Sequence, residues 1–337
     1  MRKKNNQPAR DSDETKLLVA TASHNNKEAE VAMAELALSI QLPLRQGILN
    51  GDITGGIFEP IQVDINSSTD FPLDFLAPGT EKEFVAFTIP NHGYIPQRHI
   101  EGDFVHVPVY DVGNAIDWNL KYAREARWDV ITKAKAVFQN GFVKKMNDDC
   151  WQTILTAGYD RNIIVFDSDA AAGQFTKRLV SLMKTVMRRN GGGNSTSQNR
   201  GQLTDLFMSP EAMEDMRNWN VDEVDEVTRR EIFTSTNDNV MNRIFGVNLR
   251  DLDELGEGQE YNDYFDVDLG ATLPSGDLEI VVGLDLSSND SFVMPIKEEV
   301  SVYDDPVLHR QRRAGIYGWM SAGVGVLDGR RVLVGSL

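Results

Sequence analysis

The chain has 337 residues, 41% hydrophobic and 25% charged, a composition typical of a soluble globular protein with a substantial core. Its formal net charge of −17 argues against a protein that wraps duplex DNA with a basic face, and its single cysteine, Cys150, excludes an intrachain disulfide and a cysteine-based zinc cluster. The sequence has no apolar run of about 18 residues and no apolar segment behind its N-terminal charges, so we expect neither a transmembrane helix nor a secretory signal.

The N-terminal region divides into a polar arm and a helix. Residues 1–25 show no apolar periodicity, so we expect this arm to become ordered only on a neighbouring chain. The segment 25–49 predicts a helix, because apolar residues recur at intervals of three and four: Ala29, Ala32, Met33, Leu36 and Ile40. Pro43 is expected to end or kink this helix, since proline lacks the N–H that an interior helical position donates.

The next region changes from helical to strand-like patterning. The segments 57–65, 83–90 and 103–112 alternate polar with β-branched or aromatic residues, which is typical of strands. Turn-rich pieces separate them, so we expect an extended β-hairpin with a polar tip. An isolated hairpin is marginally stable in water, and this one is therefore expected to lie on a partner.

The strongest helical pattern of the chain runs over residues 117–156, with no proline inside it and Gly158 near its end. Its apolar positions recur at helical spacing: Trp128, Ile131, Phe138, Phe142, Met146 and Ile154. Such a helix would be about 55 Å long, several times the usual globular length. Lys135 interrupts the apolar stripe, so we expect a structural strut on a sheet and not a coiled coil.

The remaining residues predict mixed helices and strands, giving an α+β fold. A strand at 162–167 precedes a helix at 171–190, whose expected buried residues are Phe175, Leu179, Leu182, Met183 and Val186. An exposed loop at 191–201 leads to a strand and a short helix, with Ser209 as N-cap and Pro210 at the first helical position. Further strands are expected at 244–250, 277–286 and 291–303. The chain closes with two strands about an Asp328-Gly329 turn.

The sequence shows little that indicates chemistry. It contains no nucleophile elbow, zinc-protease or phosphate-loop motif. His92, His99 and His106 recur every seven residues, but intervening prolines and glycines exclude a shared helical face. The acidic stretch 251–268 lacks the spacing of a calcium loop and predicts a surface loop. We expect no catalytic residue, metal site or cofactor, and interpret the five tryptophans as core or interface anchors.

The charge is unevenly distributed along the chain. Residues 201–305 hold 26 acidic and 6 basic residues, a net of −20, whereas residues 121–190 hold 13 basic and 7 acidic, a net of +6. Residues 306–337 hold five arginines and one aspartate, a net of +4. These regions are either solvated faces, or opposite-sign surfaces through which neighbouring copies meet.

Two segments carry a resemblance to a known family. Residues 107–125, VPVYDVGNAIDWNLKYARE, read as a hairpin strand that leads directly into the long helix, and residues 209–219, SPEAMEDMRNW, read as a capped helix after a strand. With the polar arm, extended hairpin and terminal strands, this order resembles the major capsid protein of tailed bacteriophages. The resemblance implies the Hong Kong 97-type fold, which bacterial encapsulin shells also use.

The resemblance implies five segments. They are an N-terminal arm and helix (1–50), an extended loop (51–116), a spine helix with part of the peripheral domain (117–164), an axial domain (165–285) and a return to the peripheral domain (286–337). It also implies contacts between subunits. Our candidates for these contacts are Lys82, Phe84, Phe87, Arg188, Arg189, Arg310, Arg312 and Arg313.

The function implied is structural. The chain would assemble as hexamers and pentamers into an icosahedral virion shell around double-stranded DNA, in the host cytoplasm. Portal protein and separate scaffolding or decoration proteins would be partners, without a membrane. Some family members link a hairpin lysine to a peripheral-domain asparagine. Residues 306–337 contain no asparagine to pair with Lys82, so we expect no such crosslink.

Three alternatives remain at this point. An encapsulin would share the fold but enclose protein cargo. A hydrolase could use carboxylates among Asp251, Asp253 and Glu254, provided that their environments separate the two pKa values. An adhesin or tail-fibre component would more often show strand repeats, which this sequence lacks. For a shell around DNA, we expect the acidic region 201–305 to face outward or to lie at interfaces.

Overall fold

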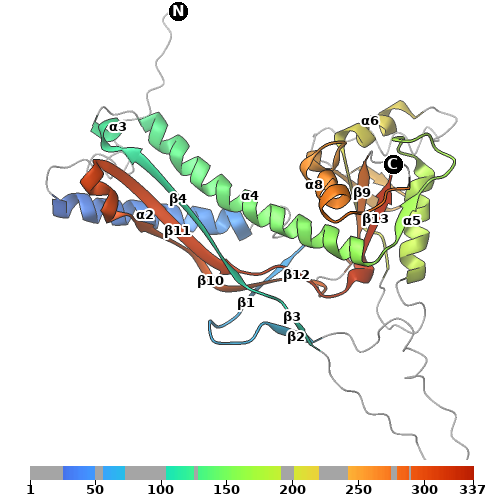
Figure 1. The fold of residues 1–337 in the computed structure, drawn as a ribbon, viewed down its shortest axis with the longest axis horizontal. Helices are drawn as coiled ribbons and strands as arrows, with labels where there is room; N and C mark the ends of the chain where they lie inside the picture. Colours follow the sequence, from blue (N-terminus) through green and yellow to red (C-terminus); the bar gives the residue numbers. More distant parts are fainter. Residues whose placement is uncertain are drawn as a thin grey trace, which may run out of the picture. The chain divides into compact units, whose positions relative to one another are not determined.

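The computed structural model describes residues 26–49, 56–72, 104–124, 128–190, 201–219, 242–274, 279–287 and 290–337 (Figure 1). The chain divides into two compact units. Unit 1 comprises Met1–Thr69, Val107–Asp149 and Met294–Val324, and unit 2 comprises Asp70–His106, Cys150–Val293 and Gly325–Leu337. Among the described residues, no helix combines the length and apolar character that a membrane span requires.

Unit 1 is built around a long, twisted sheet. Its elements, in chain order, are α2 (Asn26–Leu49), β1 (Glu59–Gln62), β4 (Tyr110–Asn119), α3 (Leu120–Arg124), the start of α4 (Trp128–Asp160), most of β10 (Phe292–Asp304), the 3-10 helix η5 (Pro306–Gln311) and β11 (Arg313–Ala322). The strand order is β1-β10-β11-β4, and the short β12 (Gly325–Val326) pairs with the first residues of β10. β11 runs antiparallel to both of its neighbours.

The long helix α4 covers one face of this sheet. Phe138, Phe142 and Met146 are fully buried, and the rings of Phe138 and Phe142 meet edge to face at 5.3 Å. The side-chain amide of Asn114 in β4 donates to the Phe138 carbonyl at 3.1 Å. Gly318 in β11 gives the Phe138 ring its room, since a Cβ there would lie 3.3 Å from the ring. The strut expected from the sequence is therefore confirmed.

The start of the long helix differs from the prediction. Residues 117–119 were expected in the helix but belong to β4, where Asp117 pairs with Gly315 and Asn119 with Arg313. The Asn119 side chain accepts from the backbone N–H of Lys121 at 2.9 Å and begins α3. α4 itself has 33 residues, about 50 Å. Backbone pairing with β11 keeps residues 117–119 in β4 and so sets the boundary between strand and helix. Sequence periodicity does not reveal this pairing.

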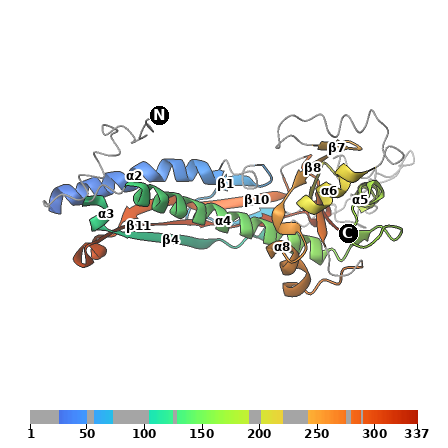
Figure 2. The same cartoon turned by 90° about the horizontal axis from the view of Figure 1, so that it is seen from above.

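The N-terminal helix α2 lies along β10 (Figure 2). Its predicted apolar stripe is buried at Ala32, Met33, Leu36 and Ile40, and the Gln41 amide donates to the Val300 carbonyl at 3.0 Å. Pro43 does not end the helix, which continues to Leu49. Leu44, directly after the proline, is 1% exposed, so tertiary packing holds the last turns in place.

Unit 2 is built around a second sheet of six strands. Its elements are β2 (Asp70–Pro72), β3 (Phe104–His106), the end of α4, β5 (Ile164–Phe166), α5 (Lys177–Asn190), β6 (Asp205–Met208), α6 (Pro210–Asn218), β7 (Asn242–Ile244), β8 (Val247–Asp251), η3 (Asp253–Leu255), α8 (Glu260–Asp263), η4 (Tyr264–Asp268), β9 (Ile280–Leu284), η6 (Gly329–Arg331) and β13 (Val332–Ser336). The strand order is β5-β13-β9-β6-β8-β7. β2 and β3 form a separate antiparallel pair.

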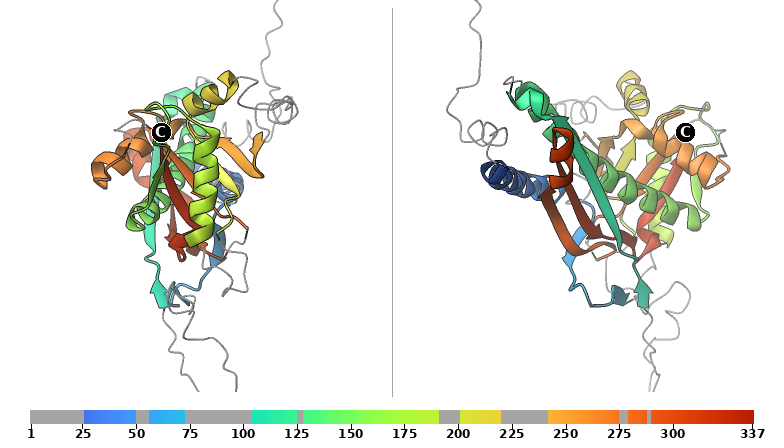
Figure 3. Two further views of the ribbon diagram at one scale, coloured as in Figure 1. Left: turned by 90° about the vertical axis from the view of Figure 1, so that its right-hand side faces the viewer. Right: turned by 60° about the vertical axis from the view of Figure 1, so that its left-hand side comes forward.

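Helices cover both faces of the unit 2 sheet (Figure 3). On one face, α5 and α6 bury a cluster that includes Leu179, Met183 and Met216 with Leu206 of β6. On the other face, the Trp151 ring of α4 meets Phe207 at 4.9 Å and Tyr261 of α8 at 6.0 Å. Successive residues of β6 therefore point into two different cores.

Several local predictions are confirmed in unit 2. Ser209 caps α6 by accepting from the Ala212 N–H at 3.0 Å, and Pro210 begins the helix. α5 forms, but it begins at Lys177 and not at the predicted residue 171. Its fully buried residues are Leu179, Val180, Met183 and Met187, while Leu182 and Val186 are only partly buried. The stripe that faces the sheet is thus rotated from the predicted one.

Two predictions in the C-terminal half are wrong. Residues 251–268 are not a loop but the short helical turns η3, α8 and η4, because Leu255, Tyr261 and Phe265 are buried. The strands that flank Asp328-Gly329 do not form a hairpin. β11 belongs to the sheet of unit 1 and β13 to that of unit 2, where Asp328 caps η6 through the Arg330 N–H.

The extended hairpin is described only at its base. Asp70 to Pro72 pair with Phe104 to His106, as an antiparallel hairpin requires. The predicted strand at 83–90 and the tip lie outside the described residues, as does most of the predicted loop at 191–201.

Candidate subunit interface

The described residues give little basis for catalytic chemistry. No group of three or more histidine, cysteine, aspartate or glutamate side chains within them is placed to hold a metal ion. Cys150 is buried in α4. Of the carboxylates considered for a hydrolase, Asp251 and Asp253 are exposed and Glu254 is half-buried.

Unit 2 carries a strongly basic helix surface on α5. Burial of Leu179, Val180, Met183 and Met187 against the sheet turns the other side of the helix outward. All of its charged residues are cationic, and all are exposed. We call them the α5 basic face: Lys177, Arg178, Lys184, Arg188 and Arg189. The predicted contact residues Arg188 and Arg189 are therefore brought together with three further cations.

Two cations of the α5 basic face also bind within the chain. The Arg178 guanidinium contacts Asp169 and lies 3.4 Å from Asp167. The Lys184 ammonium donates to the carbonyl of Phe245 at 2.6 Å. Phe245 lies in the β7–β8 turn with φ 50°, and the residue is 53% exposed. A large apolar side chain thus lies beside the basic face.

The opposite charge lies on the helical turns η3, α8 and η4. Residues 251–268, which we call the acidic segment, contain no lysine or arginine. Leu255, Tyr261 and Phe265 anchor the segment, and the Tyr264 hydroxyl lies 3.2 Å from that of Thr156 in α4. With the anchors buried, most of the acids are exposed: Asp251, Asp253, Glu257, Glu260, Asp263 and Asp268. Val267, 72% exposed, lies among them.

Unit 1 carries a surface of a different kind. On the face of its sheet opposite α4, three aromatic rings stack at centroid distances of 4.8–5.8 Å: Tyr303, Tyr317 and Trp319. We call this the aromatic face. The Trp319 indole donates to Glu298 at 3.2 Å, and Tyr303 is 43% exposed. The pairing of Tyr303 with Tyr317 across two strands creates the group.

The sequence did not reveal the aromatic face, because the five tryptophans are not grouped along the chain. The alternation of Tyr317 and Trp319 signals that both rings share one side of a strand. The contribution of Tyr303 depends on strand register. Trp118, Trp151 and Trp219, by contrast, are buried anchors, as expected.

The remaining predicted contact residues are divided between described and undescribed parts of the chain. Arg310, Arg312 and Arg313 are exposed at the η5–β11 corner of unit 1. Arg313 forms an ion pair with Asp117 of 3.2 Å, and Arg312 adopts the left-handed conformation with φ 57°. They lie in a different unit from Arg188 and Arg189. Lys82, Phe84 and Phe87 lie outside the described residues.

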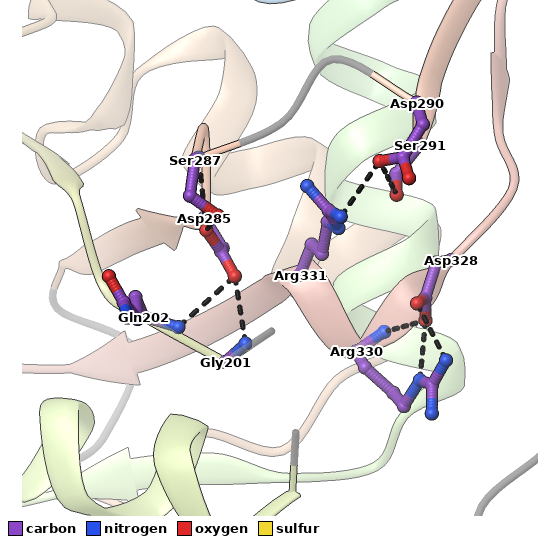
Figure 4. Close-up of polar contacts among 9 residues, drawn as sticks. All are labelled: Gly201, Gln202, Asp285, Ser287, Asp290, Ser291, Asp328, Arg330 and Arg331. Atoms are coloured by element: carbon purple, nitrogen blue, oxygen red, sulfur yellow. Dashed lines mark hydrogen bonds and ion pairs between the residues drawn. The ribbon is translucent and has the colours of Figure 1, made fainter. Parts of the chain in front are cut away.

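A third group of charged residues supports the fold of unit 2 (Figure 4). The fully buried Asp285 accepts hydrogen bonds from the backbone N–H groups of Gly201 and Gln202, at 2.8 and 3.1 Å. Arg331, 1% exposed, pairs with Asp290 at 2.7 Å, and Arg330 pairs with Asp328 at 2.8 Å. These contacts fix the segments that lead into β10 and β13.

No protein-family profile and no curated protein matches the sequence. Solved structures do match. The capsid asymmetric unit of cyanophage Pam1 aligns with a TM-score of 0.57 at 15% identity, over 83% of this chain and 87% of that one. A structure of Microbacterium phage Oxtober96 gives 0.55 at 10% identity, over 83% and 89%. The capsid of a native GTA particle gives 0.51 at 10% identity, over 84% and 88%. The chain therefore has the Hong Kong 97-type fold of tailed-phage major capsid proteins, as its element order predicted.

Proposed function

We propose that this protein is a major capsid protein, a structural subunit that assembles into an icosahedral phage head around double-stranded DNA. The observation that carries the proposal is the alignment with the Pam1 capsid subunit over most of both chains. At 15% identity the alignment supports the fold alone. The exposed residues of the subunit provide separate support for the function.

The surfaces of unit 1 support a role in assembly. On the aromatic face the exposed Tyr303 stacks with the half-buried Tyr317 and Trp319, and α2 exposes Val31 and Leu38 to 58% and 63%. Obligate interfaces are large and more apolar than ordinary surface, and aromatic residues are enriched in them. A single copy leaves Val31, Leu38 and Tyr303 exposed, and a shell would bury them.

Several further parts of the proposal come from the family resemblance. The subunits would form hexamers and pentamers, with portal protein and separate scaffolding or decoration proteins as partners. We assign residues 165–285 to the axial domain and residues 117–164 and 286–337 mainly to the peripheral domain. The net charge of −17 implies that DNA is retained by confinement within the shell and not by tight binding. Assembly would take place in the host cytoplasm and the product would be the virion shell.

The test is electron microscopy of the purified full-length chain, expressed with and without candidate scaffolding protein, followed by analysis of the particle contents. Closed icosahedral particles that hold or package duplex DNA would support the proposal. Smaller particles that enclose a specific protein cargo would identify an encapsulin instead. A protein that stays monomeric under all assembly conditions would contradict both.

A further inference from the structure

Two oppositely charged surfaces lie on opposite sides of unit 2. The α5 basic face packs over the side of the sheet that contains Leu206, and the acidic segment packs over the side that contains Phe207. Figure 1 shows β9 and β13 between α8 and α5, and the left view of Figure 3 shows the two helices on either side of the sheet. The two surfaces therefore cannot meet each other within one copy.

We infer that the α5 basic face of one copy binds the acidic segment of a neighbouring copy, with Lys184 and Arg188 opposite Asp263 and Asp268. This inference rests on the proposed shell function and names one contact that would build it. A contact between two different surfaces is heterologous, and repeating it around an axis closes a ring when the rotation per subunit allows closure. The partner is thus a second copy of this chain.

The chemistry of both surfaces fits one interface. The basic face presents cations without any acid on the same helix, and the acidic segment presents carboxylates without any cation. Each surface also carries an exposed apolar residue, Phe245 beside Lys184 and Val267 beside Asp268. An apolar centre surrounded by complementary charge is the usual anatomy of a protein interface.

A nucleic acid is a weaker candidate for the basic face. Residues 201–305, most of which belong to the same unit, have a net charge of −20, so the overall charge around the basic face opposes the approach of phosphates. Arg178 is also partly neutralised by Asp167 and Asp169, and the other cations of the face are Lys177, Lys184, Arg188 and Arg189. Four cations on one helix are few for binding duplex DNA but sufficient to set the register between two subunits.

The experiment is a charge swap in the full-length chain. One variant carries Lys184→Glu and Arg188→Glu, a second carries Asp263→Lys and Asp268→Lys, and a third combines all four changes. Because like charges would face each other, we expect each double variant to yield at least about tenfold fewer particles than the wild type. The combined variant should recover particles. Circular dichroism and thermal melting of the unassembled protein confirm that each variant is folded.

A matched control uses acids that lie elsewhere. Glu59→Lys and Asp64→Lys, both exposed in unit 1, add the same charge to the Lys184→Glu, Arg188→Glu variant. These changes should not restore particles. Phe245→Asn is a further probe, because asparagine tolerates the left-handed backbone at φ 50° better than phenylalanine does. We expect this variant to fold as well as the wild type and to lose particles about tenfold.

The outcomes separate this inference from the proposed function. Normal particles from the Lys184→Glu, Arg188→Glu variant would overturn the inference and leave the shell function intact. Normal particles with reduced DNA content would do the same and assign α5 to the packaged nucleic acid. If Glu59→Lys with Asp64→Lys restores particles as well as Asp263→Lys with Asp268→Lys does, the loss of particles is caused by net charge, and the specific contact is overturned. A wild type that never assembles would overturn the shell function and the inference together.

Discussion

The two sheets of this protein differ in how completely one chain covers them. In unit 2, every residue of β6, β9 and β13 is buried, because helices pack on both faces of the sheet. In unit 1, exposed residues of β4 alternate with buried or half-buried ones, and only the face under α4 is closed. The opposite face presents Tyr303, Tyr317 and Trp319. The sheet of unit 2 is therefore covered on both faces within one chain, whereas the sheet of unit 1 is covered on one face.

This difference separates the two sources of stability in the protein. Burial of both faces lets unit 2 gain hydrophobic free energy within a single chain. The sheet of unit 1 gains the same only where α4 and α2 cover it. A subunit built in this way is expected to fold first around unit 2 and to become fully stable on association.

The largest expected effect compares a tryptophan from each unit. Trp151→Ala removes a fully buried ring that contacts Phe207 and Tyr261, and should lower the free energy of unfolding by about 3–5 kcal/mol. Trp319→Ala on the aromatic face should cost the isolated subunit about 1 kcal/mol or less. Urea unfolding with hydrogen-exchange mass spectrometry measures both and locates each loss. Equal costs would remove the distinction between the two sheets.

The next effect compares a buried carboxylate with an exposed one. Asp285 accepts hydrogen bonds from the N–H groups of Gly201, Gln202 and Ser287. Asp285→Asn places an amide donor against one of these donors and should cost about 2–3 kcal/mol. Asp117→Asn only weakens the exposed pair with Arg313 and should cost about 1 kcal/mol or less. Thermal melting of both variants in parallel would show whether this ranking holds.

A third comparison uses one glycine from each sheet. A Cβ on Gly335 in β13 would lie 2.8 Å from Val281 and 3.0 Å from Met183, whereas a Cβ on Gly113 in β4 would meet only the Gly318 carbonyl at 3.6 Å. Gly335→Ala should therefore cost about 1–3 kcal/mol, and Gly113→Ala should stay within about 0.5 kcal/mol. Denaturant midpoints provide the measurement, and a larger loss at Gly113 would contradict the open face.

The smallest effect concerns the pH dependence of unit 2. Burial raises the pKa of the Glu279 carboxyl, which the Ser209 hydroxyl contacts at 2.6 Å, and nearby Glu211, Asp215 and Glu257 raise the pKa further. A raised carboxyl pKa contributes stability at low pH that is lost as the pH rises through the folded-state pKa. Glu279→Gln should therefore be more stable than the wild type at pH 7, and the difference should disappear towards pH 4.

Unfolding curves at several pH values, with the exposed Glu59→Gln as control, would measure this difference. Wild-type and Glu279→Gln proteins that keep the same stability at every pH would contradict the assignment. If the Glu59→Gln control in unit 1 has the same pH dependence of stability as the wild type, the pH effect is located in unit 2.

Local sequence signals predicted the elements that depend on near neighbours. The spacing of Leu36 and Ile40 identified the buried side of α2, and Ser209-Pro210 identified the start of α6. The length of α4 followed from an uninterrupted periodicity. Errors arose where distant strands decide the outcome. Pairing with β11 extends β4 over Asp117, and pairing with two different sheets separates β11 from β13.

The candidate interface shows the same division. The family resemblance suggested Arg188 and Arg189 as contact candidates, and the sequence shows the acidic residues between 251 and 268. It could not show that α5 and α8 lie on opposite sides of one sheet, since that depends on which core each helix enters. It also missed the aromatic face, which strand register assembles from Tyr303, Tyr317 and Trp319.

Properties of consecutive residues were sufficient to predict the order of the long elements, the extreme length of α4 and the opposite charges of α5 and the acidic segment. Which faces remain open could be seen only in the folded chain. Whether a strand is covered on one side or on both depends on contacts between residues far apart in the chain, and those contacts left one sheet complete and the other exposed.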